Sequence, residues 1–120
     1  MAKTILIVDD VATDRAAVRE TVKKLGYLTI EASNGAVAVS MAKEQKPDAI
    51  LMDVVMPEMS GFEATREILA DESTKYIPIV IVSSRAQKSD FHRANLIGAK
   101  GYVTKPVDAA ALTEALKAIA

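Results

Sequence analysis

The chain lacks residue types on which whole classes of protein depend. Its 120 residues include no cysteine, no tryptophan and a single histidine, His92. Without cysteine there are no disulfides or thiolate metal ligands, and one histidine is too few for a histidine-rich metal site. We therefore expect His92 to be a solvated or partner-facing residue, and any bound metal to be held by oxygen atoms.

Long hydrophobic runs are also missing. No apolar segment approaches the roughly 18 residues that a membrane-spanning helix needs. The first apolar run ends at two acidic residues, Asp9 and Asp10, and is too short for a signal peptide. These features predict a soluble cytoplasmic protein with no membrane partner.

An excess of positive charge is the third absence. Fifteen lysines and arginines face 16 aspartates and glutamates, which gives a formal net charge of -1. Nucleic-acid binding usually relies on a basic excess that neutralises phosphates, so the composition argues against a nucleic-acid partner. With half of its residues hydrophobic, the chain has ordinary globular composition and the length of one domain, residues 1–120.

Short apolar runs alternate with longer segments of helical periodicity. Unbroken runs at 4–8, 49–52 and 79–82 predict central strands buried on both faces, and two mixed stretches, 27–32 and 101–105, predict edge strands. The predicted helices cover 13–25, 35–45, 62–71, 87–97 and 109–120. Alternating strands and helices predict an α/β fold, a doubly wound five-stranded parallel sheet of strand order 2-1-3-4-5.

Polar residues follow the predicted strands where ligands bind in such sheets, at the carboxyl ends. Asp9 and Asp10 follow the first strand and Asp53 the third, while Ser83 and Lys105 lie at the ends of the last two. Two unit charges about 4 Å apart repel by about 4 kcal/mol at an effective dielectric near 20. Three converging carboxylates therefore require either a raised pKa or a bound dication.

The chemistry of these residues narrows the choice of metal and reaction. An all-oxygen site favours Mg²⁺, Mn²⁺ or Ca²⁺ over zinc, and few carboxylates beside a lysine suit Mg²⁺. Lys105 and Ser83 are groups that bind phosphoryl oxygens. Asp53 is a candidate nucleophile, because carboxylates form aspartyl-phosphate intermediates.

Four segments, "ILIVDD", "PDAILMDVVMPEMSG", "IPIVIVSSRA" and "GAKGYVTKPV", resemble the motifs of one family in order and spacing. Over all 120 residues the chain resembles the receiver domain of two-component response regulators. The resemblance implies a flavodoxin-like (βα)5 fold and phosphoryl transfer from a histidine kinase to Asp53. It also implies Mg²⁺ held by the carboxylates of Asp10 and Asp53 and the backbone carbonyl of Val55, with Asp9 acting through water.

The resemblance assigns roles to the residues at the last two strands. Lys105 would contact the phosphoryl group, Ser83 would be the switch hydroxyl, and Tyr102 would be the aromatic residue that changes rotamer with it. The family also usually has a cis bond at the position of Lys105–Pro106. Val55 and Arg85 stand at positions that vary in the family, and we expect them to modulate the chemistry at the site.

The resemblance also implies how the signal leaves the protein. With no sequence after residue 120, we expect output by protein contact through the face of helix 87–97, strand 101–105 and helix 109–120, or by competition for kinase phosphoryl groups. Catalysis would be limited to self-phosphorylation and autodephosphorylation. The segments "KPDAILMDVVMPEMSGFEATREI" and "TKYIPIVIV" resemble single-domain receivers of type IV pilus twitching motility, and flagellar chemotaxis is the alternative pathway.

Two other classes of protein stay open from the residues alone. The first is a Mg²⁺-dependent phosphotransferase or phosphatase with an aspartyl nucleophile. Such enzymes commonly carry a general acid two residues past the nucleophile, where this chain has Val55, and a covering insertion that this chain lacks. The second is a flavin-binding electron carrier, but the loop after the first strand, "DDVATD", is acidic and would repel a phosphate.

Overall fold

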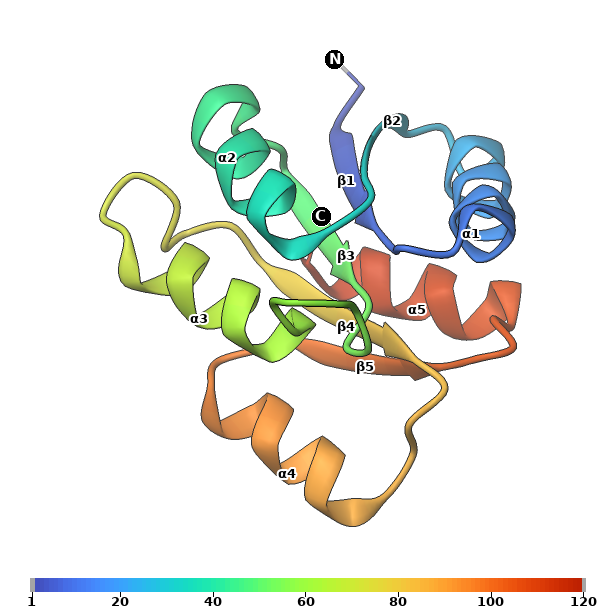
Figure 1. The fold of residues 1–120 in the computed structure, drawn as a ribbon. Helices are drawn as coiled ribbons and strands as arrows, with labels where there is room; N and C mark the ends of the chain where they lie inside the picture. Colours follow the sequence, from blue (N-terminus) through green and yellow to red (C-terminus); the bar gives the residue numbers. More distant parts are fainter. Residues whose placement is uncertain (1, 120) are drawn as a thin grey trace.

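Strands and helices alternate along the chain, as the sequence predicts (Figure 1). The structure is a computed structural model that describes residues 2–119. The elements in chain order are β1 Thr4–Val8, α1 Ala12–Lys24, β2 Leu28–Ala32, α2 Gly35–Gln45, β3 Ala49–Met52, α3 Gly61–Ala70, β4 Ile79–Ser83, α4 Lys88–Leu96, β5 Gly101–Thr104 and α5 Ala109–Ile119.

The predicted element boundaries agree with these bounds to within one residue. Two of the differences concern the site. Ser83 is the last residue of β4 rather than the first residue after it, because its backbone pairs with Thr104 of β5. Lys105, predicted at the end of the strand 101–105, is the first residue after β5. The predicted helix 109–120 includes Ala120, which lies outside the described residues.

The five strands form one parallel sheet in the order β2-β1-β3-β4-β5, which confirms the predicted topology. In the register of β1 with β3, Val8 is paired with Met52. The residues that follow this pair are Asp9 and Asp53, so the register alone places both at the same level of the same sheet edge.

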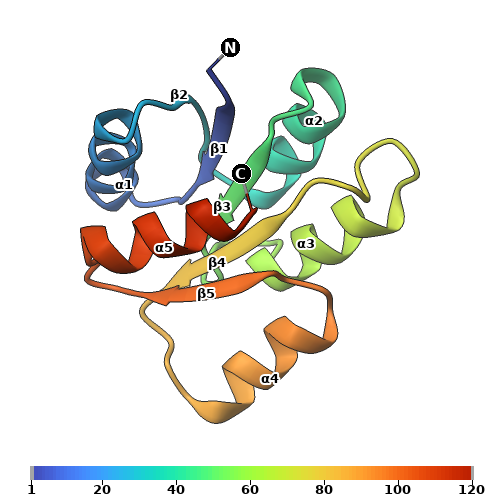
Figure 2. The same ribbon diagram turned by 180° about the vertical axis from the view of Figure 1, so that it is seen from behind.

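Helices cover both faces of the sheet, with α1 and α5 on one face and α2, α3 and α4 on the other (Figures 1 and 2). Residues of β1 alternate between two buried clusters: Ile5 and Ile7 pack towards α1 and α5, and Leu6 and Val8 pack towards the other three helices. Burying each such isoleucine or leucine contributes about 1.5–3 kcal/mol. Two-sided burial is therefore the reason for the unbroken apolar runs in the central strands.

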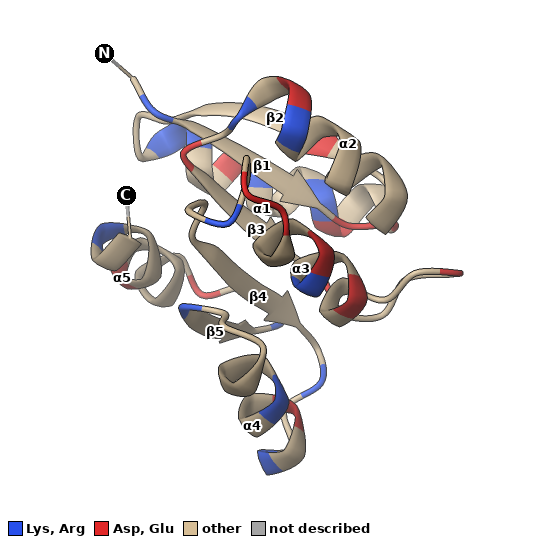
Figure 3. Ribbon diagram, turned by 90° about the vertical axis from the view of Figure 1, so that its left-hand side faces the viewer, with Lys and Arg blue, Asp and Glu red and all other residues tan. Residues whose placement is uncertain are grey.

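Charged residues of both signs are interspersed along the ribbon (Figure 3). Within residues 2–119, none of the helices combines the length and the apolar character that crossing a membrane requires. Against these mixed charges, the three carboxylates of Asp9, Asp10 and Asp53 at the end of the sheet form a local acidic cluster.

Candidate functional site

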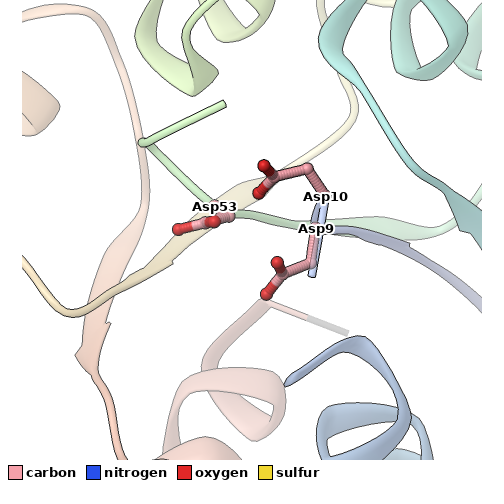
Figure 4. A group of neighbouring side chains, drawn as sticks. All are labelled: Asp9, Asp10 and Asp53. Carbon is pink, nitrogen blue, oxygen red and sulfur yellow. The ribbon is translucent and has the colours of Figure 1, made fainter. Parts of the chain in front are cut away.

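Three carboxylates converge where β1 and β3 end, as the strand order predicts. Asp9 and Asp10 follow β1, Asp53 follows β3, and the Asp53 amide donates a hydrogen bond to the Val8 carbonyl at 3.0 Å. Each aspartate offers a carboxylate oxygen within 4.8 Å of those of the other two. Figure 4 shows the three side chains together at the strand ends. Asp9 and Asp53 are buried, while Asp10 is exposed.

Lys105 brings the positive charge of the site. Its Nζ lies 2.7 Å from Asp9 Oδ2, 3.0 Å from Asp14 Oδ2 and 3.6 Å from Asp53 Oδ2. Burial lowers the pKa of Lys105, but the hydrogen bonds to Asp9 and Asp14 and the charge of Asp53 outweigh it and raise the pKa. The lysine is therefore a fixed cation, and one cation cannot neutralise all of the carboxylates around it.

The surroundings of Asp53 disfavour a negative charge on its carboxylate. Burial and the charge of Asp9 raise the pKa of Asp53 to about 6, although Lys105 and a hydrogen bond from the Val54 amide at 2.9 Å act in the opposite direction. This residual charge imbalance, together with a donor set made only of oxygen atoms, fits a hard dication such as Mg²⁺.

The loop from β3 to α3 presses against the backbone of Asp53. The Gly61 amide donates a hydrogen bond to the Val54 carbonyl at 2.9 Å, and a Cβ at position 61 would clash with the Asp53 carbonyl oxygen. Ser60 caps the N-terminus of α3, because its hydroxyl accepts a hydrogen bond from the Glu63 amide. Sequence reasoning treated this stretch as a turn and missed the requirement for glycine at position 61.

An arginine on α1 fixes the position of Asp9. Arg15 Nη1 donates to the Asp9 carbonyl at 2.8 Å, and Arg15 Nε donates to Glu31 Oε1 at 3.0 Å. The Val11 amide donates to Asp9 Oδ1 at 2.9 Å. These bonds fix both the backbone and the carboxylate of Asp9, and neither Arg15 nor Glu31 was predicted to take part.

Ser83 and Tyr102 are both bonded to the main chain of Arg85. The Arg85 amide donates to Ser83 Oγ at 3.2 Å, and the Tyr102 hydroxyl donates to the Arg85 carbonyl at 2.7 Å. Ser83 is fully buried, and the Tyr102 ring meets the Phe91 ring edge to face with centroids 4.5 Å apart. Burial and the charge of Asp90 raise the pKa of Tyr102, so its hydroxyl remains a donor.

The side chains of the two predicted modulators, Arg85 and Val55, have different surroundings. The Arg85 guanidinium is paired with the buried carboxylate of Asp90, with Nε 2.9 Å from Oδ1. Val55 is 57% exposed, and His92 is exposed on α4. The Lys105–Pro106 peptide bond is cis, as the family resemblance predicts.

This fold and this site define a receiver-type signalling domain, with an acidic crevice beside a lysine at the carboxyl ends of a parallel sheet. The chain belongs to the family of response regulator receiver domains, whose sequence model matches residues 5–117. It is therefore a switch of two-component signalling, which confirms the family predicted from its motifs.

Known relatives cover almost the whole chain. Protein PilH of Pseudomonas aeruginosa is 40% identical over 115 residues, which are 96% of this chain and 95% of PilH. The polar-differentiation response regulator DivK of Brucella anthropi is 35% identical over 117 residues, which are 98% of this chain and 95% of DivK.

Solved structures show the same fold. The chemotaxis protein CheY4 of Vibrio cholerae has a TM-score of 0.93 at 28% identity, with 100% of both chains covered. The receiver domain of the sensor histidine kinase PA1611 of Pseudomonas aeruginosa has a TM-score of 0.90 at 32% identity, covering 99% of this chain and 98% of that one. That structure has a magnesium ion coordinated in its active site cleft.

Proposed function

We propose that Asp53 accepts a phosphoryl group from the phosphohistidine of a histidine kinase. The observation that carries this proposal is the convergence of Asp53 with Asp9, Asp10 and Lys105 at one sheet edge. In the transfer, a carboxylate oxygen of Asp53 bonds to phosphorus while the bond from phosphorus to the histidine nitrogen breaks. The imidazole leaves with the electron pair of that bond, so the reaction balances without a further reactant.

The surroundings of Asp53 support this role. The hydrogen bond from the Val54 amide to Oδ1 fixes the orientation of the carboxylate, and Oδ2 is the oxygen 3.6 Å from Lys105. An ammonium at that position can donate to a phosphoryl oxygen and offset the charge that develops during transfer. The exposed apolar side chain of Val55 offers no hydrogen bond to an attacking water, which supports its predicted role as a modulator of the site.

We propose Mg²⁺ as the cofactor of the transfer. The carboxylates of Asp10 and Asp53 and the backbone carbonyl of Val55 would hold the ion, with Asp9 acting through water. Bound Mg²⁺ would supply neutralisation of charge on the phosphoryl oxygens. The three-carboxylate cluster and the magnesium ion in the related PA1611 receiver domain support this assignment.

The hydrogen bonds around Arg85 suggest how the new charge changes the surface. A phosphoryl group on Asp53 would attract the Ser83 hydroxyl. In the unphosphorylated protein this hydroxyl accepts a hydrogen bond from the Arg85 amide. Movement of Ser83 would then loosen the same peptide segment that holds the Tyr102 hydroxyl through the Arg85 carbonyl. Phosphorylation would thereby alter the packing of Tyr102, and with it the affinity of the neighbouring face for a partner.

We propose that this output face consists of α4, β5 and α5. Phe91 and Leu96 of α4 are 39% and 70% exposed, so apolar contact area is present there. The near-complete coverage of PilH and DivK supports action as a single receiver domain that signals by protein contact. The identity of 40% with PilH, against 35% with DivK, favours the predicted pilus pathway. The cytoplasmic location stays a prediction.

Acetyl phosphate with Mg²⁺ tests the proposed acceptor. Intact-mass measurement should show one added phosphoryl group on the parent protein and none on Asp53→Asn. Hydroxylamine should remove the group, because an acyl phosphate is labile and a serine phosphate is not. Asp48→Asn, on an exposed aspartate before β3, is the matched control and should be labelled normally. Labelling that persists in Asp53→Asn, or that resists hydroxylamine, overturns the assignment.

A further inference from the structure

The Lys105 ammonium is bonded to two carboxylates other than the proposed acceptor. Its distances to Asp9 Oδ2 and Asp14 Oδ2, 2.7 and 3.0 Å, are hydrogen-bond distances. The distance to Asp53 Oδ2, 3.6 Å, is outside hydrogen-bonding range and leaves only a charge contact. In the unphosphorylated protein the Lys105 ammonium is therefore nearer to Asp9 and Asp14 than to Asp53.

Asp14 differs from the other carboxylates of the site in origin and exposure. It lies in the first turn of α1, not at a strand end, and its side chain is 45% exposed where those of Asp9 and Asp53 are 4% and 8% exposed. It is not part of the cluster formed by Asp9, Asp10 and Asp53. Its contact with the site is the hydrogen bond to Lys105.

We propose that Asp14 is a positioning residue that holds the Lys105 ammonium beside Asp9 and short of Asp53. This inference rests on the proposed phosphorylation of Asp53. When a phosphoryl group arrives, Lys105 must donate to its oxygens, and the bond to Asp14 must lengthen or break for the ammonium to move. Asp14 therefore restrains the lysine and slows the forward transfer, and it offers the ammonium a partner to return to after dephosphorylation.

The substitution Asp14→Asn isolates this restraint. Asparagine has the shape of aspartate and keeps an acceptor oxygen, but it removes the charge that attracts the ammonium. Attraction across a half-exposed ion pair is modest, so we expect Asp14→Asn to raise the rate constant of phosphorylation by acetyl phosphate about two- to fivefold. Glu20→Gln is the matched control, because it removes one negative charge from the exposed side of the same helix.

A kinetic double-mutant cycle separates action through Lys105 from a general effect of charge. The rate increase should appear with Lys105 present and vanish in the Lys105→Met background, while Glu20→Gln should leave both rates unchanged. An equal increase in both backgrounds would mean that Asp14 merely repels the anionic donor, and it would overturn the proposal. A decrease caused by Asp14→Asn alone would overturn it as well.

The melting temperature in chelator gives a second readout that needs no phosphorylation. Asp14→Asn relieves repulsion among carboxylates in both backgrounds, but it also weakens a bond to Lys105 only where the lysine is present. The change in melting temperature should therefore be less favourable in the parent background than in Lys105→Met, by a few degrees. Equal changes in melting temperature would mean that Asp14 does not act through Lys105, and they would overturn the proposal. A parent protein that takes up no phosphoryl group while this coupling persists would overturn the proposed function instead.

Discussion

Asp53→Asn should stabilise the metal-free protein at neutral and alkaline pH. In the folded state the Asp53 side chain is only 8% exposed and faces the charge of Asp9, and its pKa is raised to about 6. Asparagine removes the charge but can keep the hydrogen bond from the Val54 amide. Lys105 loses a contact of 3.6 Å and retains its two shorter bonds.

The size and sign of this effect follow from the shift in pKa. A rise from 3.8 to about 6 corresponds to about 3 kcal/mol of unfavourable ionisation, since one unit is worth about 1.4 kcal/mol. The open side of the crevice screens part of it, so we expect about 2 kcal/mol. Because the folded pKa is the higher one, the parent protein loses this stability as pH rises from about 4 through 6. The advantage of Asp53→Asn should therefore be complete above pH 7 and absent below pH 4.

Thermal unfolding in chelator at pH 8 and at pH 4 measures this difference. For a domain of this size, about 2 kcal/mol corresponds to a rise in melting temperature of roughly 5–10 °C at pH 8. Asp71→Asn is the control of opposite sign, because hydrogen bonds from Ser73 lower the pKa of Asp71 to about 2. Melting temperatures of Asp53→Asn and parent that coincide at pH 8, or a gain that persists at pH 4, would refute the reasoning.

Three further substitutions test other parts of the structure. Gly61→Ala should lower the free energy of unfolding by roughly 2–4 kcal/mol in chemical denaturation, because the new Cβ meets the Asp53 carbonyl. Gly26→Ala should lower it by about 1 kcal/mol, because of its φ of +95° alone. Equal losses would contradict the close approach at Gly61. Asn34→Ala removes the side-chain cap of the Val37 amide at the start of α2 and should cost about 1 kcal/mol by the same assay, and no loss would contradict the cap. Tyr102→Phe should lower stability by about 1 kcal/mol and leave acetyl phosphate labelling intact, so lost labelling would place Tyr102 in the transfer itself.

The fold was predictable because the central strands are buried on both faces. Ile5 to Val8 alternate between two clusters on opposite sides of the sheet, so every position is apolar and the run reads as one buried strand. The ends of the strands were harder to predict, because a strand ends where its backbone pairing ends and not where the hydropathy of the sequence changes. Ser83 is polar, yet its pairing with Thr104 keeps it in β4.

The site was predictable only where strand order decides proximity. Asp9, Asp10 and Asp53 were found because the carboxyl ends of neighbouring parallel strands share one edge. Asp14 was missed, since no strand-end signal marks a helix residue. Its place in the first turn of α1, the helix that directly follows the loop of Asp9 and Asp10, is the signal that could have found it.

Gly61 and Arg15 were missed for a different reason. Each acts on the main chain of a site residue: Gly61 by allowing close approach to the Asp53 carbonyl, and Arg15 by a hydrogen bond to the Asp9 carbonyl. Motif and spacing arguments concern side chains with recognisable chemistry. Contacts to main-chain atoms depend on how the loops close, which is visible only in three dimensions.

Ser83 and Tyr102 are connected through hydrogen bonds to the main chain of Arg85. At position 85 the main chain and the side chain therefore have separate roles. The amide and the carbonyl carry the connection, and every residue type except proline supplies both. The Arg85 side chain has a separate partner, the buried carboxylate of Asp90, and takes no part in these two main-chain bonds. On the mechanism proposed above, replacing the side chain at position 85 should change the pairing with Asp90 and keep the connection, whereas proline, which has no amide hydrogen, should break it.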